Sequence, residues 1–221
     1  MRSDLARKRQ AGLSIVELVI VAAIIAFVTA LAVPNFLRWS DDERVKSAAR
    51  SVSDAFNLAR SEAIRTGDNH LLIFGMALSA TEPIVVVNDG PQTTANCTID
   101  ANEVVHFVAA AQGVNWGTST GAANGTLGPD DAGALPANVA TGWTFSDAGG
   151  ANTASWILFQ ADGIPRTFTA SGGACTAIGT AGQGGGGIYL TNNNRDYAVV
   201  LRPLGTARVH KWDPNASAWS N

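Results

Sequence analysis

Apolar positions in this chain follow three different spacings. The first is an almost unbroken apolar run over residues 13–33, in which Glu17 is the single ionisable residue. At about 1.5 Å of rise per helical residue, this run spans about 30 Å, the thickness of the hydrocarbon core of a bilayer. The pattern therefore predicts a membrane-spanning helix over residues 13–33.

The second spacing begins behind Pro34, where apolar residues recur every three or four positions and so line one helix face. This stripe consists of Val45, Ala49, Val52, Phe56, Ala59 and Ala63. Pro34 predicts a kink, because proline lacks a backbone N–H and its ring crowds the carbonyl four residues earlier. Residues 40–43 have the form of a capping box, at which the helix restarts, and Gly67 is predicted to end the helix. Residues 34–66 are thus an amphipathic helix that needs a partner surface.

The third spacing is found in residues 67–221, where short apolar runs alternate with turn residues, as in a β-rich head. Strands are predicted at 70–74, 84–87, 104–108, 156–159, 188–190, 197–201 and 208–212. The Gly-rich stretches 109–150 and 171–187 are predicted to be mainly loops, and the residues after Asp213 an exposed tail. The predicted fold class is α+β, with a long N-terminal helix packed on a C-terminal antiparallel β-sheet head.

Composition narrows the function classes. The formal charge is -3, and removal of residues 1–12 takes away four of the 15 basic residues and one of the 18 acidic ones, leaving -6. A chain of this charge has no general electrostatic attraction to nucleic acid. Cys97 and Cys175 both follow the apolar run, so export would make a disulfide between them the expected state, the alternative being two unpaired thiols.

The N-terminus allows three interpretations. A basic leader ahead of an apolar run is typical of a secretory signal peptide, with Ala30-Leu31-Ala32 as a cleavage site. The same pattern is typical of a plain membrane anchor whose positive side stays in the cytoplasm. Neither interpretation accounts for Glu17, which lies five residues after Gly12 at the edge of an apolar run, where a carboxylate is costly and usually functional.

The third interpretation accounts for it. The stretch Gly12-Leu13-Ser14-Ile15-Val16-Glu17 resembles the processing site of the type IV pilin and pseudopilin superfamily. The resemblance implies that prepilin peptidase cuts between Gly12 and Leu13 and that Leu13, where the family usually has Phe, becomes N-methylated. It also implies that Glu17 pairs with the N-terminal amine of a neighbouring subunit and so sets the register of a filament.

Within this superfamily, the residues 159–163 and the late run 197–208 resemble the GspH/FimT group of minor pseudopilins and minor pilins. The implied domains are a cleaved leader (1–12), a transmembrane and filament-core helix (13–33), an amphipathic second half (34–66) and a β-rich head (67–221). The implied partners are other pilin or pseudopilin subunits, prepilin peptidase and an inner-membrane assembly platform. The implied location is the bacterial inner membrane, single-pass with a periplasmic head, and then a filament. The choice between type II secretion and a type IV pilus stays open.

Two alternative functions remain compatible with the sequence. One is a Sec-exported periplasmic β-rich binding protein cut after Ala32. The other is a DNA-binding minor pilin for DNA uptake, because Arg202, Arg208 and Lys211 form a basic cluster near the C-terminus. The cluster lacks one arginine of the basic motif found in DNA-binding members of the group, so no nucleic acid partner is expected. The three histidines are scattered and no catalytic or metal motif is present, so neither an enzyme, a metal nor a cofactor is expected.

Overall fold

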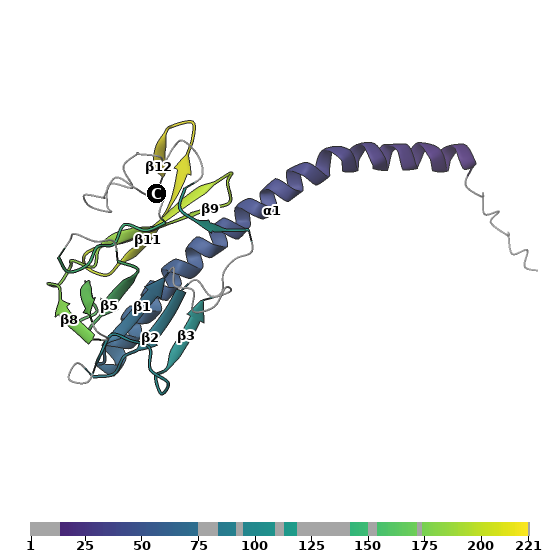
Figure 1. Cartoon of the computed structure of the whole chain (residues 1–221). Helices are drawn as coiled ribbons and strands as arrows, with labels where there is room; N and C mark the ends of the chain where they lie inside the picture. The colour runs from purple at the N-terminus through teal and green to yellow at the C-terminus, as the bar shows by residue number, and fades with distance from the viewer. Residues whose placement is uncertain are drawn as a thin grey trace, which may run out of the picture. The chain divides into compact units, whose positions relative to one another are not determined.

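A computed structural model describes residues 14–74, 84–91, 95–108, 113–118, 142–149, 154–171 and 174–220, without the side chains of residues 107–108, 169–171 and 174–176. The predicted processing residues Gly12 and Leu13 lie outside this part. The chain divides into two compact units, residues 1–40 and residues 41–221. One long N-terminal apolar helix and two antiparallel β-sheets are present, so the predicted α+β class is confirmed (Figure 1).

Helix α1 runs from Ile15 to Thr66 without interruption and contains Pro34. Because Pro34 has no N–H, the carbonyl of Ala30 loses its helical hydrogen bond, yet the helix continues on both sides. The predicted restart at residues 40–43 is wrong. Two acidic residues in this run instead pair with the next turn, Asp41 with Arg44 and Glu43 with Lys46, at 3.5 and 3.2 Å. Since the helix already supplies its own backbone partners there, no cap is needed.

The helix ends where the sequence predicts. Gly67 has a φ of 78° and its N–H donates to the carbonyl of Ala63 at 3.0 Å. Glycine adopts this left-handed conformation without the steric penalty of a Cβ atom, which makes it a common residue after a helix. The chain then turns directly into the first strand.

Ten strands of the second unit form two five-stranded sheets. Sheet A has the order β3-β2-β1-β5-β6 and consists of β1 (His70–Phe74), β2 (Ile84–Asn88), β3 (Val105–Val108), β5 (Trp156–Phe159) and β6 (Pro165–Arg166). Sheet B has the order β12-β11-β10-β9-β4 and consists of β4 (Asn115–Trp116), β9 (Gly186–Thr191), β10 (Asp196–Leu201), β11 (Ala207–Asp213) and β12 (Ala218–Ser220). All pairings in both sheets are antiparallel.

Every predicted strand is present, but two predicted irregular segments also contain strands. β8 (Ala174–Ile178) lies in the stretch predicted to be a Gly-rich loop and pairs with β7 (Phe168–Ser171). β12 lies in the predicted exposed tail and pairs with β11, where Trp212 stands opposite Trp219. The residues after Asp213 are mostly exposed, as predicted, but three of them form a strand, and the loop prediction is wrong for β8. Backbone pairing to a neighbouring strand stabilises segments whose own composition has no strand pattern.

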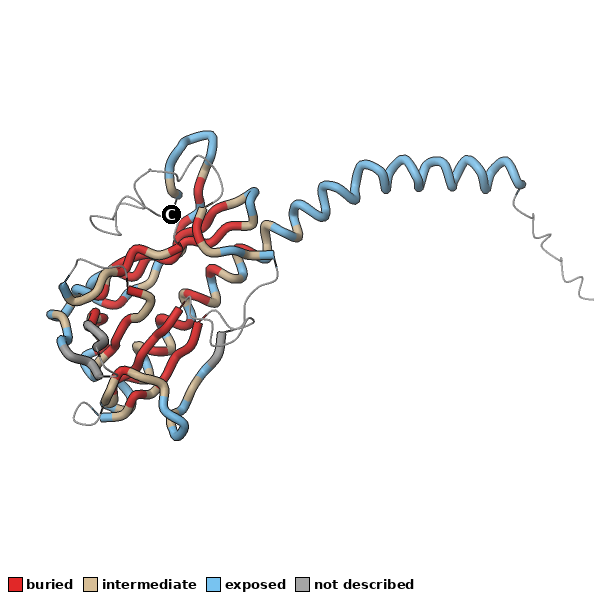
Figure 2. Tube along the Cα trace, in the orientation of Figure 1, coloured by how far each residue is buried: buried red, intermediate tan, exposed pale blue. Residues whose placement is uncertain are grey.

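The main core is built by the second half of the helix and one face of each sheet. The predicted stripe is buried as expected, and Ala55 is buried together with it. From sheet A it contacts residues that include Leu72 and Phe159, and from sheet B residues that include Ile188 and Val199. Two smaller clusters cover the other faces of the sheets, one around Val87 and Cys97 and one around Tyr189. Figure 2 shows this buried zone in red along the helix and both sheets of the second unit.

Two turns, one from each sheet, meet the helix at Arg60. Gly163 follows β5 with a φ of 68°, and Gly205 lies between β10 and β11 with a φ of 82°. The guanidinium of Arg60 donates from Nη1 to the carbonyl of Gly205 at 3.3 Å. A Cβ atom on Gly205 would lie 2.6 Å from the carbonyl oxygen of Gly163, and one on Gly163 would lie 2.5 Å from Ile64 Cδ1. Gly205 is therefore required by close packing against a backbone atom as well as by its conformation, whereas Gly163 is favoured by its conformation and faces the movable end of the Ile64 side chain.

We expect Gly205→Ala to destabilise the protein more than Gly67→Ala does. Both residues have positive φ, which costs a residue with a Cβ atom about 1–2 kcal/mol, but no atom lies within 4 Å of the position that a Cβ on Gly67 would take. Gly205→Ala also overpacks a backbone contact, which adds about 1–3 kcal/mol. Denaturant unfolding of the full chain in mild detergent measures the two values. Equal destabilisation by both variants would show that the contact between the turns contributes nothing.

Candidate functional site: the exposed half of the N-terminal helix

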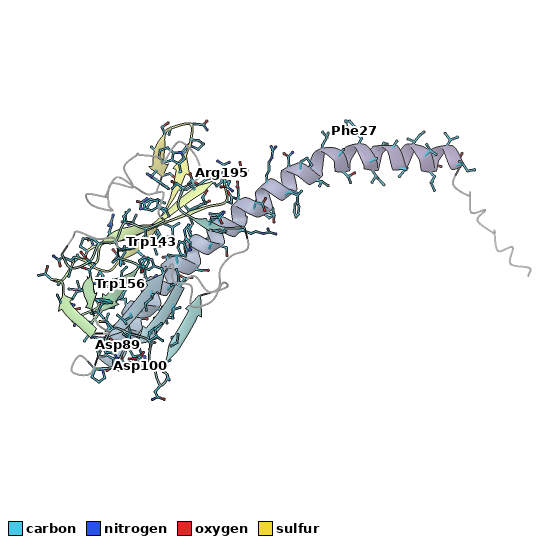
Figure 3. The ribbon with its side chains drawn as sticks, in the orientation of Figure 1. Phe27, Asp89, Asp100, Trp143, Trp156 and Arg195 are labelled. Atoms are coloured by element: carbon cyan, nitrogen blue, oxygen red, sulfur yellow. The ribbon has the colours of Figure 1, made fainter. Side chains whose placement is uncertain are left out.

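Residues 15–39 of α1 form a helix segment whose residues are all exposed. Its large apolar side chains range from 49% exposure at Val21 to 83% at Ile15, and Trp39 at its C-terminal end is 59% exposed. Phe27 is 69% exposed and points away from the helix axis (Figure 3). A contiguous apolar surface of this size marks a place where a membrane or another protein covers the chain. The segment is therefore the candidate functional site.

Length and composition allow this segment to cross a membrane. None of its most apolar stretch is buried. A transmembrane helix must satisfy its polar groups internally, and the described polar side chains in the middle of the segment do so. The Thr29 hydroxyl donates to the carbonyl of Ile25 at 2.8 Å, and Asn35 Nδ2 donates to the carbonyl of Leu31 at 3.3 Å. Both groups thus remain hydrogen-bonded without water.

Small residues form a stripe along this segment. Ala22, Ala26 and Ala30 are spaced by four residues and therefore lie on one helix face. Small side chains let the backbones of two helices approach closely, which is how helices associate in lipid. The stripe alone identifies no partner, but it gives the exposed helix one face suited to close packing beside another helix.

Glu17 lies in the first turn of the helix. The first backbone N–H groups of a helix have no intrahelical partner, and the helix dipole makes this end favourable for a negative charge. The hydrogen bond from the N–H of Leu18 to the carbonyl of Ser14 at 3.1 Å shows that the helix is already formed here. The register role predicted for Glu17, and the kink predicted at Pro34, stay predictions.

The second half of the helix is held to the head by an ion pair that the sequence pattern did not indicate. Arg195 Nε, in the turn between β9 and β10, donates to Asp42 Oδ2 at 3.1 Å. The two side chains are 37% and 30% exposed, so solvent screens the pair and its contribution is modest, about 1 kcal/mol or less. The residues lie 153 positions apart. No local signal in the sequence links residues so far apart, so only the folded chain reveals the pair.

The predicted basic cluster does not form one surface. Arg208 and Lys211 are both exposed on β11, but they are three positions apart, and side chains alternate between the faces of a strand. Arg208 stands opposite Val200 and Lys211 opposite Tyr197 on β10. Tyr197 packs in the main core cluster, so Lys211 belongs to the core-facing side and Arg208 to the other side. On either side of Lys211, His210 and Trp212 are buried.

The third member of the basic cluster, Arg202, lies in the turn that joins β10 to β11, and its N–H donates to the carbonyl of Thr206 at 2.9 Å. In the described part of the chain, no group of three or more His, Cys, Asp or Glu residues is arranged to hold a metal ion. Cys97 is disulfide-bonded. The side chain of Cys175, on β8, lies outside the described residues, so the predicted pairing of the two cysteines stays a prediction.

Comparisons of the chain with known protein families, with curated proteins and with solved structures found no match.

We expect the full chain in mild detergent not to retard short double-stranded DNA in a gel-shift assay at low salt. The reason is that Arg208 and Lys211 lie on opposite faces of β11, while a phosphate backbone is bound by cations gathered on one surface. The matched variants Arg208→Ala and Lys211→Ala should behave like the unmodified chain. A retarded band that Arg208→Ala abolishes would contradict this prediction and restore a nucleic acid partner.

Proposed function

We propose that this protein is a minor pilin or pseudopilin, a structural subunit of a type IV pilus or of a type II secretion pseudopilus. The single observation that carries the proposal is the division of α1 into two halves. Residues 15–39 are exposed and apolar, whereas the stripe between Val45 and Ala63 is buried against two sheets. A helix of this kind presents one half to lipid or to other helices and fixes its other half in a folded head.

The pattern around Gly12 supports the same proposal independently. A basic leader, Gly12, an apolar residue 13 and Glu17 resemble the prepilin peptidase site of the superfamily. In this proposal the peptidase removes residues 1–12 and methylates the amine of Leu13. The mature chain stays in the inner membrane through its apolar helix, with the head in the periplasm, until an assembly platform in that membrane moves it into a filament.

Glu17 has a defined task in this proposal. A carboxylate among lipid or packed apolar helices is costly unless it is neutralised or paired with a cation. The amine created at residue 13 of a neighbouring subunit is such a cation. The pairing then allows only one axial offset between neighbouring subunits. A shift of one subunit by a single helical turn would separate the carboxylate from the amine and leave both charges unpaired. The stripe of Ala22, Ala26 and Ala30 would allow the close helix contact that this pairing requires.

The position of cleavage distinguishes this proposal from a Sec-exported binding protein. We expect mass spectrometry of the mature protein from its native host to find N-methylated Leu13 as the first residue. Cutting after Gly12 keeps the whole exposed helix, whereas cutting after Ala32 removes most of it. An unmodified Val33 at the N-terminus would overturn the proposal, because a chain without residues 13–32 has no helix with which to enter a filament.

We expect Glu17→Ala to leave cleavage after Gly12 largely intact but to reduce the share of the protein recovered in sheared filaments by about tenfold or more, the effect of losing about 1.4 kcal/mol of pairing energy. Thr29→Ala is the matched control, since Thr29 is a polar residue of the same segment whose hydroxyl bonds within its own helix. The control should assemble normally. Normal assembly of Glu17→Ala would show that Glu17 does not set the register.

A further inference from the structure

Two ionisable residues lie at the two ends of the apolar part of the exposed helix. Glu17 is in the first turn of α1, and Arg38 is the next ionisable residue along the chain. Residues 18–37 between them carry no ionisable side chain. At about 1.5 Å of rise per residue, this stretch is about 30 Å long, which equals the thickness of the hydrocarbon core of a bilayer. Glu17 and Arg38 are therefore about one hydrocarbon thickness apart along the helix.

The helix is continuous over the whole of this stretch. α1 passes through Pro34 without interruption, so the helical rise applies all the way from Glu17 to Arg38. The apolar run in the sequence predicts a span that ends at residue 33, in front of the proline. Because the helix continues, residues 35–37 extend the uncharged surface as far as Arg38.

Polar side chains inside the stretch have partners in their own helix. Thr29 and Asn35 donate to backbone carbonyls at 2.8 and 3.3 Å. Glu17 and Arg38 differ from them, because both are exposed and no described residue forms an ion pair or a side-chain hydrogen bond with either. An unpaired ion requires water or lipid headgroups around it, whereas a hydrogen-bonded hydroxyl or amide does not. The stretch is therefore suited to hydrocarbon in its middle and to a polar layer at both ends.

An aromatic pair lies at the Arg38 end. Phe36 and Trp39 are three positions apart and so share a helix face, and their ring centroids are 5.8 Å apart. The two residues are 62% and 59% exposed. A tryptophan ring has an apolar body and one N–H donor, and this combination suits the layer between hydrocarbon and headgroups. No described residue accepts the indole N–H of Trp39, which leaves it available to a lipid carbonyl.

Behind Trp39 the helix becomes ionic. Asp41 pairs with Arg44 at 3.5 Å, and Glu43 pairs with Lys46 at 3.2 Å. These four side chains are between 38% and 54% exposed, as expected for ion pairs in contact with water. Each charge would be costly in hydrocarbon, so the bilayer core cannot extend into this part of the helix. The surface suited to lipid therefore ends at Trp39.

We propose that α1 spans the bilayer from Glu17 to Arg38, with Glu17 in the headgroup layer of one leaflet and Arg38, flanked by Phe36 and Trp39, in that of the other. The guanidinium of Arg38 then lies beside lipid phosphates, whose charge it complements. Phe27, about midway between the two ions, lies at the centre of the bilayer (Figure 3). This inference rests on the membrane stage of the proposed function, but not on removal of the leader or on filament assembly.

The arrangement gives Glu17 two successive environments. In the membrane its carboxylate lies among headgroups and water and needs no partner from the protein. In the proposed filament the same carboxylate leaves water and lies among apolar helices, where it needs the amine of a neighbouring subunit. Transfer from the membrane to the filament therefore favours the one register in which that amine is present.

Quenching of tryptophan fluorescence by brominated lipids tests the position of the aromatic pair. Of the six tryptophans, Trp39 is the one within residues 1–40. The full chain and Trp39→Phe are reconstituted at low protein-to-lipid ratio in phosphatidylcholine–phosphatidylglycerol vesicles, and the difference between them is the signal of Trp39. We expect lipids brominated close to the headgroup to quench this signal more than lipids brominated near the chain end. Absent quenching, or the opposite order, would overturn the proposal.

A second probe distinguishes a spanning helix from one that lies on the membrane surface. The chain carries Phe27→Trp together with Trp39→Phe, so that its probe is about midway between the two ions. We expect the order of quenching to reverse, with the deeper bromines acting more strongly. Equal depths for the two probes would overturn the proposal, because a helix lying flat places both at one depth.

Labelling of introduced cysteines tests the other end of the span. Glu17→Cys and Phe27→Cys are compared in the oxidised full chain in lipid nanodiscs, which leave both leaflets open to a membrane-impermeant maleimide. The unmodified chain gives the background from Cys97 and Cys175. We expect position 17 to react about tenfold or more faster than position 27, since apolar surroundings disfavour the thiolate that reacts. Equal rates would overturn the proposal.

These outcomes are separate from those that test the proposed function. The uncut chain in vesicles is neither processed nor assembled, so an absence of filaments in the native host leaves the expected depths unchanged. A chain that forms filaments although Trp39 is not quenched by lipid would overturn this inference alone.

Discussion

Burial of one stripe of α1 between two sheets is the contact on which the head depends. The stripe contains Ala49, Ala59 and Ala63 besides the larger Phe56, and these small residues let the helix lie close to both sheets. Apolar faces of the two sheets are covered by this one helix, so the sheets share a single main core. Removing the helix would expose both faces to water, at about 25 cal/mol for each Å² of apolar surface. The head and the second half of the helix are therefore one folding unit, which also agrees with the compact unit that begins at Asp41.

The close approach of the turns at Arg60 explains why glycine is present in the two stretches that resemble the GspH/FimT group. In sequence, Gly163 and Gly205 are separate turn signals, each consistent with many folds. In the structure, they contact each other and the same helix residue. The resemblance of residues 159–163 and 197–208 thus corresponds to one packing constraint, in which both sheets reach the helix. This contact gives a physical reason for the two glycines.

Polar groups in the head serve to position loops. Asp42 in the helix pairs with Arg195 in the turn between β9 and β10, and Asp89 holds a loop through backbone N–H groups. Neither role was visible in the sequence, where residues 40–43 had the form of a capping box. A local pattern describes the partners that a side chain has within a few residues. In these cases the partner came from another element and changed the role of the residue.

The sequence by itself determined the helix, its two halves, its end at Gly67 and seven of the strands, because apolar spacing and turn residues act over short distances. Only the tertiary structure decided that two sheets cover the helix, that the segments at β8 and β12 are strands, and that Arg208 and Lys211 face opposite ways. These features depend on pairing between segments far apart in the chain, and such pairing is selected by the packing of the whole head. The exposed half of α1 belongs to the first group, since its apolar surface is complete in the sequence before any partner is present.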